Sequence, residues 1–270
     1  MNKAVDTRLV VSAAAVAALV VIAVIAPSIV PYDPYDVQTS QKLLPVSPEH
    51  WLGTDELGRD EFSRILMGLR PTLFSALAVV AASMAIGTIL GVVAGYFGGI
   101  VDRAVMWLVT TFNAFPSFLL AIVVAGLFGA GLENAVIALV IVYWTTFARL
   151  GRGLVAQIKQ ENFVRAALLS GCNNATLLIR HVAPNAMPQL LVTATSEVGS
   201  VILSMSGLSF LGLASQRPTA EWGIMLSSAQ EVLRSTPQLA LYASIAIVAV
   251  VLIFNSFGDA LRDRLDRRQS

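Results

Sequence analysis

Residues 161–171 read Glu-Asn-Phe-Val-Arg-Ala-Ala-Leu-Leu-Ser-Gly, and residues 181–185 read His-Val-Ala-Pro-Asn, within the longest polar interruption in the C-terminal half of a very apolar chain. The apolar side chains of the first segment recur at helical spacing. Gly171 and the asparagines after it favour a helix end, because both residue types tolerate the left-handed conformation found there. A second short helix is predicted over residues 175–180 and is closed by Pro184, because proline cannot continue a helix beyond its first turn. The stretch therefore predicts two short helices at an angle to each other, between two membrane spans.

The composition indicates an all-α integral membrane protein. Of its 270 residues, 56% are hydrophobic and 13% are charged, whereas a soluble domain carries about 25% charged residues. A net charge of +1 gives no basic surface for nucleic acid. The single cysteine, Cys172, excludes a disulfide within the chain and is interpreted as a small packing residue.

Six charge-poor segments are interpreted as membrane spans, since about 20 helical residues cross a bilayer core. A signal peptide is the alternative for the first segment, but its apolar run is too long and no small-residue cleavage site follows. The predicted spans cover residues 9–32, 71–101, 104–127, 135–148, 186–213 and 239–258.

The polar segment before the second span is predicted to end in an amphipathic helix. Phe62, Ile65, Leu66 and Leu69 fall on one helical face. This helix is expected to lie at the membrane surface or, in the other interpretation, to pack on neighbouring spans. The predicted organisation is an N-terminal span with an extracytoplasmic segment (1–70), followed by a five-span core (71–270) that contains the loop 149–185.

Two features of the spans suggest specific packing. Gly87, Gly91 and Gly95 lie four apart, a spacing that lets two helices approach closely in lipid. Pro116, near Asn113, predicts a kink in the third span. The kink is interpreted either as a structural bend or as a gate.

Glu197 lies inside the fifth predicted span. It falls about 14 Å into the helix, near the middle of a hydrocarbon core of about 30 Å. Because an acidic group there is costly, we expect it to face a protein interior or a water-filled path. Glu197 is therefore either a pathway or partner-contacting residue, or a hydrogen-bonded packing group.

The basic residues predict the orientation of the chain. Twelve of its 18 lysines and arginines belong to the termini, the loop after the second span and the loop 149–185. Positive residues favour the cytoplasm. Both termini and the two short helices are therefore expected on the cytoplasmic side.

Enzymatic motifs are missing from the sequence. None of the three lysines follows a glycine, so no phosphate-binding Gly-Lys-Ser/Thr loop is present. His50 and His181 fall on opposite sides of the predicted membrane, and with one cysteine the chain offers no metal-ligand cluster. The chain is therefore not expected to be an enzyme or to bind a metal of its own.

The loop resembles the "EAA" loop of ABC importer permeases, which reads Glu-Ala-Ala, three residues, Gly, nine residues, an apolar residue, any residue, Leu and Pro. The Glu-Ala-Ala part of the motif aligns with Arg165, Ala166 and Ala167, and its glycine aligns with Gly171. The end of the motif aligns with residues 181–184, which begin with His181 and end with Pro184, and Asn185 follows. Arg165 replaces the family's leading glutamate. The resemblance implies that this loop is a coupling helix on the ATPase subunit, with Gly171 in a close-packed turn.

Four further stretches resemble the dipeptide/oligopeptide/nickel branch of these permeases, and specifically its "C"-type subunit. They are residues 51–60, 208–213, 218–223 and 258–263. Peptide importers often carry an acidic residue at the position of Met205. In the absence of an acidic residue there, and in its Ala-Glu-Trp-Gly run, the chain resembles nickel or metal-chelate permeases.

The resemblance implies a type I importer permease of six spans in a bacterial inner membrane. It would form half of a pathway for metal chelates or short peptides. Its partners would be a second homologous permease in a heterodimer, two ATP-binding subunits that use ATP, an extracytoplasmic solute-binding protein and membrane lipid. Candidate pathway residues are Asn113, Glu197 and Met205. The alternatives are a stand-alone ion-coupled carrier or channel, and a membrane scaffold without a pathway.

Overall fold

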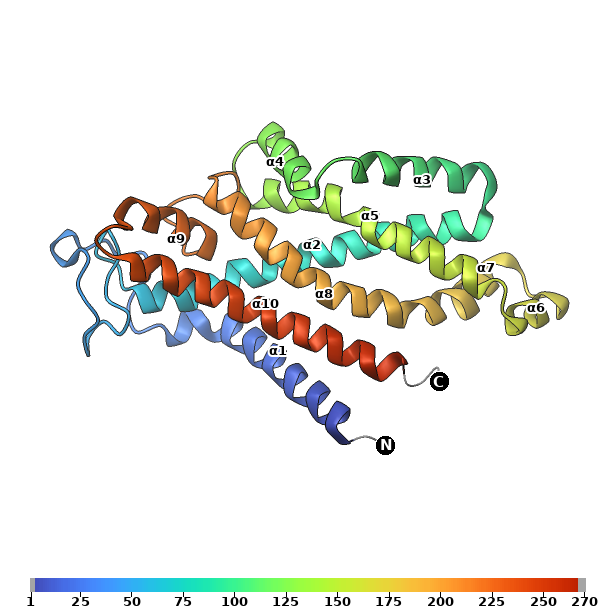
Figure 1. Ribbon diagram of the computed structural model, residues 1–270, viewed down its shortest axis with the longest axis horizontal. Helices are drawn as coiled ribbons and strands as arrows, with labels where there is room; N and C mark the ends of the chain where they lie inside the picture. The colour runs from blue at the N-terminus through green and yellow to red at the C-terminus, as the bar shows by residue number, and fades with distance from the viewer. Residues whose placement is uncertain (1–2, 267–270) are drawn as a thin grey trace.

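The computed structural model describes residues 3–266; the first two residues and the last four, including Arg267 and Arg268 of the orientation count, lie outside the described residues. The described chain is helical, with loops between the helices (Figure 1). The long helices are α1 (Lys3–Ile29), α2 (Glu61–Phe97), α5 (Leu132–Ile158), α8 (Ala183–Phe210) and α10 (Pro237–Asp266). The shorter helices are α3 (Gly99–Asn113), α4 (Ser117–Phe128), α6 (Asn162–Leu169), α7 (Asn174–Leu177) and α9 (Trp222–Ala229), with single turns η1 (Thr39–Gln41), η2 (Leu178–Val182) and η3 (Gln230–Val232).

The long helices account for five of the predicted spans. Between residues 3 and 266, five helices are long and apolar enough to cross a membrane, and α3 and α4 pass the same test as a pair. The pair is bent by 92° at its junction. With this pair taken as one broken span, the all-α architecture of six spans is confirmed.

Figure 1 shows how the helices are arranged in the bundle. α1 and α10 lie on one side, α3 and α4 on the other, and α5 and α8 between them. The short helices α6 and α7 mark one end, here called the α6 end, and α9 with residues 30–60 marks the opposite α9 end. The chain termini belong to the α6 end, because the C-terminal end of α1 lies beside the start of α2 and the start of α10 packs near α9.

The closest contact within the bundle joins α2 and α5. At three glycines of α2, an added Cβ would come within van der Waals distance of a backbone carbonyl oxygen of α5: Gly87 against Trp144 (2.2 Å), Gly91 against Ala148 (2.3 Å) and Gly95 against Arg152 (2.7 Å). The predicted glycine stripe is therefore the surface on which the two helix backbones meet.

The predicted surface helix at residues 61–70 is not a separate element. It is the first part of α2, which continues through Pro71 without a break, so the expected boundary at residue 70 falls inside a helix. Asp60 begins α2, with its carboxylate accepting hydrogen bonds from the backbone N–H and the hydroxyl of Ser63 at 2.8 and 2.7 Å. The second interpretation of this segment, a helix packed within the bundle, agrees with the structure.

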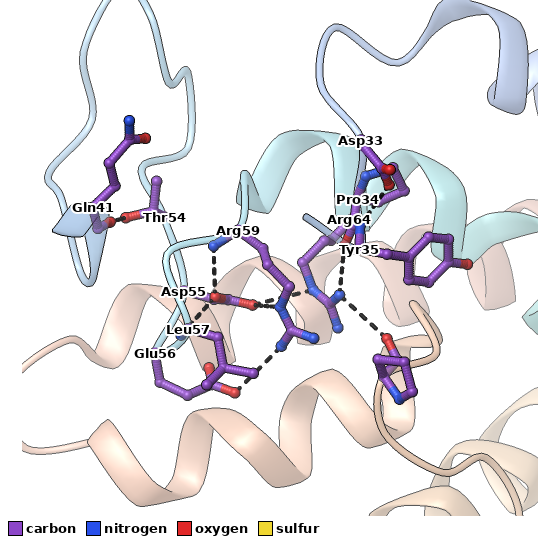
Figure 2. Close-up of polar contacts among 11 residues, drawn as sticks. Asp33, Pro34, Tyr35, Gln41, Thr54, Asp55, Glu56, Leu57, Arg59 and Arg64 are labelled. Atoms are coloured by element: carbon purple, nitrogen blue, oxygen red, sulfur yellow. Dashed lines mark hydrogen bonds and ion pairs between the residues drawn. The ribbon is translucent and has the colours of Figure 1, made fainter. Parts of the chain in front are cut away.

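At the start of α2, the side chain of Arg64 is buried against the loop that precedes the helix (Figure 2). Asp55 receives Arg59 Nε at 2.7 Å and Arg64 Nε at 3.3 Å, and all three side chains are at most 4% exposed. Arg64 also donates to the carbonyl oxygens of Pro34 at 2.8 Å and Pro218 at 3.5 Å. Nη1 of Arg59 is buried without a hydrogen-bond partner among the described residues. The ion pairs and hydrogen bonds therefore offset only part of the cost of burying these charges. They connect three chain segments at the α9 end.

The Ala-Glu-Trp-Gly run fixes α9 to α2. Glu221 caps α9 by accepting hydrogen bonds from the backbone N–H groups of Gly223 and Ile224 at 3.0 and 3.1 Å, and Trp222 Nε1 donates to Ile65 O at 2.9 Å. Burial raises the pKa of the Glu221 carboxyl, and hydrogen bonds from Gly223, Ile224 and Thr72 act in the opposite direction. The run therefore has a structural role at the α9 end.

The third span bends far more sharply than a proline kink. α3 ends at Asn113, and Pro116 forms the N-terminal cap of α4 with its carbonyl oxygen accepting from Leu120 N at 3.0 Å. Since Pro116 has no N–H, it begins α4 instead of bending a continuous helix.

Candidate coupling module and translocation face

The segment between α5 and α8 folds as two short helices, as predicted. α6 ends in a Schellman motif: Gly171 has a φ of +81°, and Cys172 N donates to Ala167 O at 3.1 Å. Asn173 then caps α7, because its side-chain oxygen accepts from Thr176 N at 2.8 Å. No described atom lies within 4 Å of a Cβ added at Gly171, so the turn is open. The expectation of a close-packed turn is wrong, and the glycine is required for its backbone conformation.

The second short helix does not end at Pro184. α7 continues through η2, a wide π turn in which Ala183 N donates to Leu178 O, directly into α8. Pro184 occupies the first turn of α8, where its missing N–H costs no hydrogen bond. The wide turn precedes the proline because π turns accommodate an interrupted hydrogen-bond ladder. α8 thus continues directly from the two-helix segment. This segment, residues 162–182, is here called the coupling module.

The inner side of the coupling module is attached to α2 and α5. Val164, Leu177 and Val182 are buried in an apolar cluster with side chains near the ends of those helices. Tyr96, in the last turn of α2, donates its hydroxyl to Asn174 Oδ1 at 2.7 Å. Lys159, directly after α5, donates to Tyr96 O at 2.5 Å and lies 5.1 Å from the centre of its ring. The module is therefore joined to α2 and α5 by buried contacts and hydrogen bonds, and to α8 by a continuous helix.

The outer side of the coupling module is apolar and basic. Leu169 is 90% exposed, Ile179 72% and Phe163 43%, and the nearby Arg165 and Arg180 are also exposed. We name these five residues the coupling surface. Exposed apolar side chains with charged neighbours, outside or at the edge of the spans, are typical of a protein contact site.

The structure places the predicted coupling residues on or beside this surface. Arg165, Ala166, Gly171, Pro184 and Asn185 are exposed, and Ala167 and His181 are half-buried. Asn185 Nδ2 donates to His181 O at 2.6 Å across the junction with α8.

A groove of about 580 Å³, with a mixed polar and apolar lining, runs along α5. Asn113 lines it from the end of α3, and Thr146, Arg149 and Gln157 line it from α5. Asn113 Nδ2 also donates to Val109 O at 2.7 Å. Arg149 is exposed in this groove and makes no ion pair within the described residues.

The side of α8 that carries Glu197 contacts α5 through Tyr143. Glu197, Ser200 and Ser204 follow one another at helical spacing. Tyr143 of α5 hydrogen-bonds with Ser204 Oγ at 2.9 Å and with Ser200 O at 3.3 Å. Tyr143 lies one turn from Thr146 on α5. The groove, Tyr143 and the Glu197 side of α8 are together called the translocation face.

Met205 does not reach this surface. Its side chain is 0% exposed, within the main apolar core. The structure thus places Asn113 in the groove, leaves Glu197 half-buried on α8 and buries Met205 in the core.

Sequence reasoning missed several residues of both sites. Tyr96 lies 78 residues from Asn174, so local spacing gives no indication of their contact. Leu169 does carry a signal, because it is a large apolar residue outside the apolar stripe of α6. Arg149 is interpreted from sequence as the start of a polar loop, but α5 continues to Ile158 and presents it to the groove.

Comparison with known proteins identifies relatives over most of the chain. Residues 87–270 match the family model described as "Binding-protein-dependent transport system inner membrane component". The chain is 39% identical over 251 residues to the nickel transport system permease protein NikC of Escherichia coli K12, covering 93% of this chain and 91% of that protein. It is 39% identical to the dipeptide transport system permease protein DppC of Alkalihalophilus pseudofirmus (93% and 83% covered). It is 42% identical to the glutathione transport system permease protein GsiD of Pectobacterium atrosepticum (92% and 83% covered).

Solved structures with a similar fold are membrane components of ABC transporters. A chain of the inward-facing MetNI methionine ABC transporter aligns with a TM-score of 0.60 at 18% identity, covering 75% of this chain and 96% of that one. A chain of an amino acid ABC transporter solved with histidines aligns with a TM-score of 0.54 at 16% identity, covering 77% and 94%.

Proposed function

Since this chain belongs to the family of binding-protein-dependent transport inner membrane components, the permeases of ABC importers, we propose that it forms half of a translocation pathway. The other half is a second, homologous permease in a heterodimer. An extracytoplasmic binding protein delivers the substrate, and two ATP-binding subunits use the ATP. The chain itself is the non-catalytic, membrane-embedded component.

The coupling surface is the observation that supports this proposal. It exposes Leu169 and Phe163 outside the candidate spans while the inner side of the same module is attached to α2 and α5. A hydrophobic centre with arginines at its border suits a groove on another protein. We propose that an ATP-binding subunit docks there and that its closure moves the module.

We propose an orientation that follows from this docking. The α6 end, with both termini, lies in the cytoplasm, as the distribution of lysine and arginine predicts. The α9 end, with the buried Asp55 cluster, then faces outward in the inner membrane and meets the binding protein.

The translocation face is proposed to line the pathway. A charged or polar group within a span is stable where it meets water or protein, and this face gathers Asn113, Tyr143, Arg149 and Glu197. The second permease would close the pathway from the other side. Met205, buried in the core, is proposed to support the wall of this face by packing.

The proposed substrates are nickel or metal chelates and short peptides. The relatives that suggest them transport nickel, dipeptides and glutathione according to their names. Reconstituted importer can be tested with each of these in turn, together with its binding protein. We expect one class to stimulate both ATP hydrolysis and uptake.

The docking proposal is tested by affinity purification of this chain from native membranes in mild detergent. We expect a second permease and ATP-binding subunits to accompany the wild-type chain. Leu169→Asp should lose the ATP-binding subunits and keep the second permease, because an aspartate cannot enter an apolar groove without desolvation. Val46→Asp is the matched control, since Val46 is also exposed (59%) but lies at the α9 end. Recovery of the wild-type chain alone, with solute uptake driven by an ion gradient, would support a stand-alone carrier instead.

A further inference from the structure

A groove of about 610 Å³ lies between α1 and α10. These two helices are on the side of the bundle away from α3 and α4 (Figure 1). Its floor consists of Val11 and Ala15 from α1 and Leu252 and Ile253 from α10. Val11 is 62% exposed and Leu252 58%, so no helix of the described chain covers the floor. The translocation face does not contribute to this groove.

The rim of the groove is charged. Arg8 lines it from α1, and Asp259 and Asp263 line it from α10. The two aspartates lie four residues apart and are neighbours on one helix face, where like charges repel. All three side chains are exposed, and none forms an ion pair with another described residue. The rim thus carries one positive and two negative groups that form no ion pair within the part of the chain that the structure describes.

The groove follows the depth profile of a lipid leaflet. Arg8 and Asp263 lie near the ends of the candidate spans Thr7–Ile29 and Pro237–Leu265, whereas Ala15 and Leu252 lie inside them. At a rise of 1.5 Å per residue, the floor extends about 10–16 Å from the rim toward the bilayer centre. Charges are therefore at the interface and apolar side chains at the depth of acyl chains.

We propose that this groove binds a phospholipid whose headgroup carries a primary ammonium. The guanidinium of Arg8 suits the phosphate, and the three N–H donors of the ammonium suit the carboxylates of Asp259 and Asp263. An acyl chain lies along the apolar floor. An anionic headgroup is disfavoured, because two carboxylates outnumber one guanidinium. A choline headgroup has no N–H to donate.

The test measures lipid retention by the purified importer. The complex is stripped of lipid in detergent and then supplied with equal amounts of ethanolamine, choline and glycerol phospholipids that share the same acyl chains. Native mass spectrometry counts the lipids that remain bound. We expect at least a fivefold preference for the ethanolamine lipid, lost in Asp259→Asn/Asp263→Asn. Glu49→Gln/Glu133→Gln removes two exposed carboxylates outside the groove and should keep the preference.

A second variant addresses the floor. Leu252→Trp fills the groove without altering any charge, so the ethanolamine lipid should be lost while both permeases still co-purify. Equal retention of the three lipids by the wild type would overturn the proposal. So would an unchanged preference in the double aspartate variant, or full retention in Leu252→Trp.

Discussion

The backbone contact between α2 and α5 gives a quantitative prediction for Gly91→Ala. The added methyl would lie 2.3 Å from Ala148 O and 3.0 Å from Ala148 Cα. Ordinary contact requires about 3.5–4.0 Å between carbon atoms. The two helices would therefore have to separate locally by about 1 Å along their closest contact.

The free energy follows from two opposing effects. Overpacking of a tight contact costs about 1–3 kcal/mol, whereas replacing a helical glycine by alanine gains up to about 1 kcal/mol. We expect a net loss of about 1–2 kcal/mol. In a chain of this size that lowers the midpoint of thermal unfolding by about 2–4 °C per kcal/mol.

The same pair of helices provides matched controls. Gly153, in α5, has no described atom within 4 Å of an added Cβ, and Gly151 has Gly91 Cα at 3.8 Å. We expect Gly153→Ala to unfold at the wild-type temperature or above it, Gly151→Ala near it and Gly91→Ala below it. Thermal unfolding of the detergent-purified protein, followed by circular dichroism, gives this order directly. Equal midpoints for Gly91→Ala and Gly153→Ala would refute the proposed backbone contact.

Three further predictions concern the module and the α9 end. Tyr96→Phe removes the hydrogen bond to Asn174, worth about 0.5–1.5 kcal/mol; in proteoliposomes it should lower the solute transported per ATP, and an unchanged ratio would argue against transmission through this contact. Glu221→Gln leaves a buried backbone N–H without an acceptor and should cost about 1–3 kcal/mol in thermal unfolding. Glu231→Gln, on a carboxylate that is 60% exposed, should have little effect. Gly171→Asn should keep the ATP-binding subunits in purification and Gly171→Val should lose them, because only asparagine tolerates a φ of +81°.

Local sequence patterns predicted the elements that depend on local interactions. Long apolar runs correspond to the spans, and the stop after α6 at Gly171 follows from backbone preference at one residue. The glycine stripe also predicts a close contact with another helix, but it does not identify that helix. The answer, α5, is set by tertiary packing alone.

The open alternatives and the errors concern charges and prolines whose surroundings come from distant segments. The apolar face of residues 62–69 left open whether this helix lies at the membrane surface or packs on neighbouring spans, and the structure buries Glu61 and Arg64 of this segment at the α9 end. The carbonyl oxygen that Arg64 meets in Pro218 is 154 residues away, beyond any periodicity argument. Pro184 predicted a helix end, yet the π turn before it lets the helix continue. Met205 predicted a pathway residue from a family position, and the structure places it in the core.

The α9 end also determines the order in which the chain can reach its final form. Trp222 bonds to Ile65 across 157 residues, and Glu221 to Thr72 across 149. During synthesis the N-terminal part emerges first, so the start of α2 enters the membrane with its carboxylates and guanidinium groups without these later contacts. The contacts that close the α9 end therefore form after α9 has been made, late in synthesis. A chain truncated before residue 218 would retain its first spans but would lack the contacts that Glu221 and Trp222 make with α2.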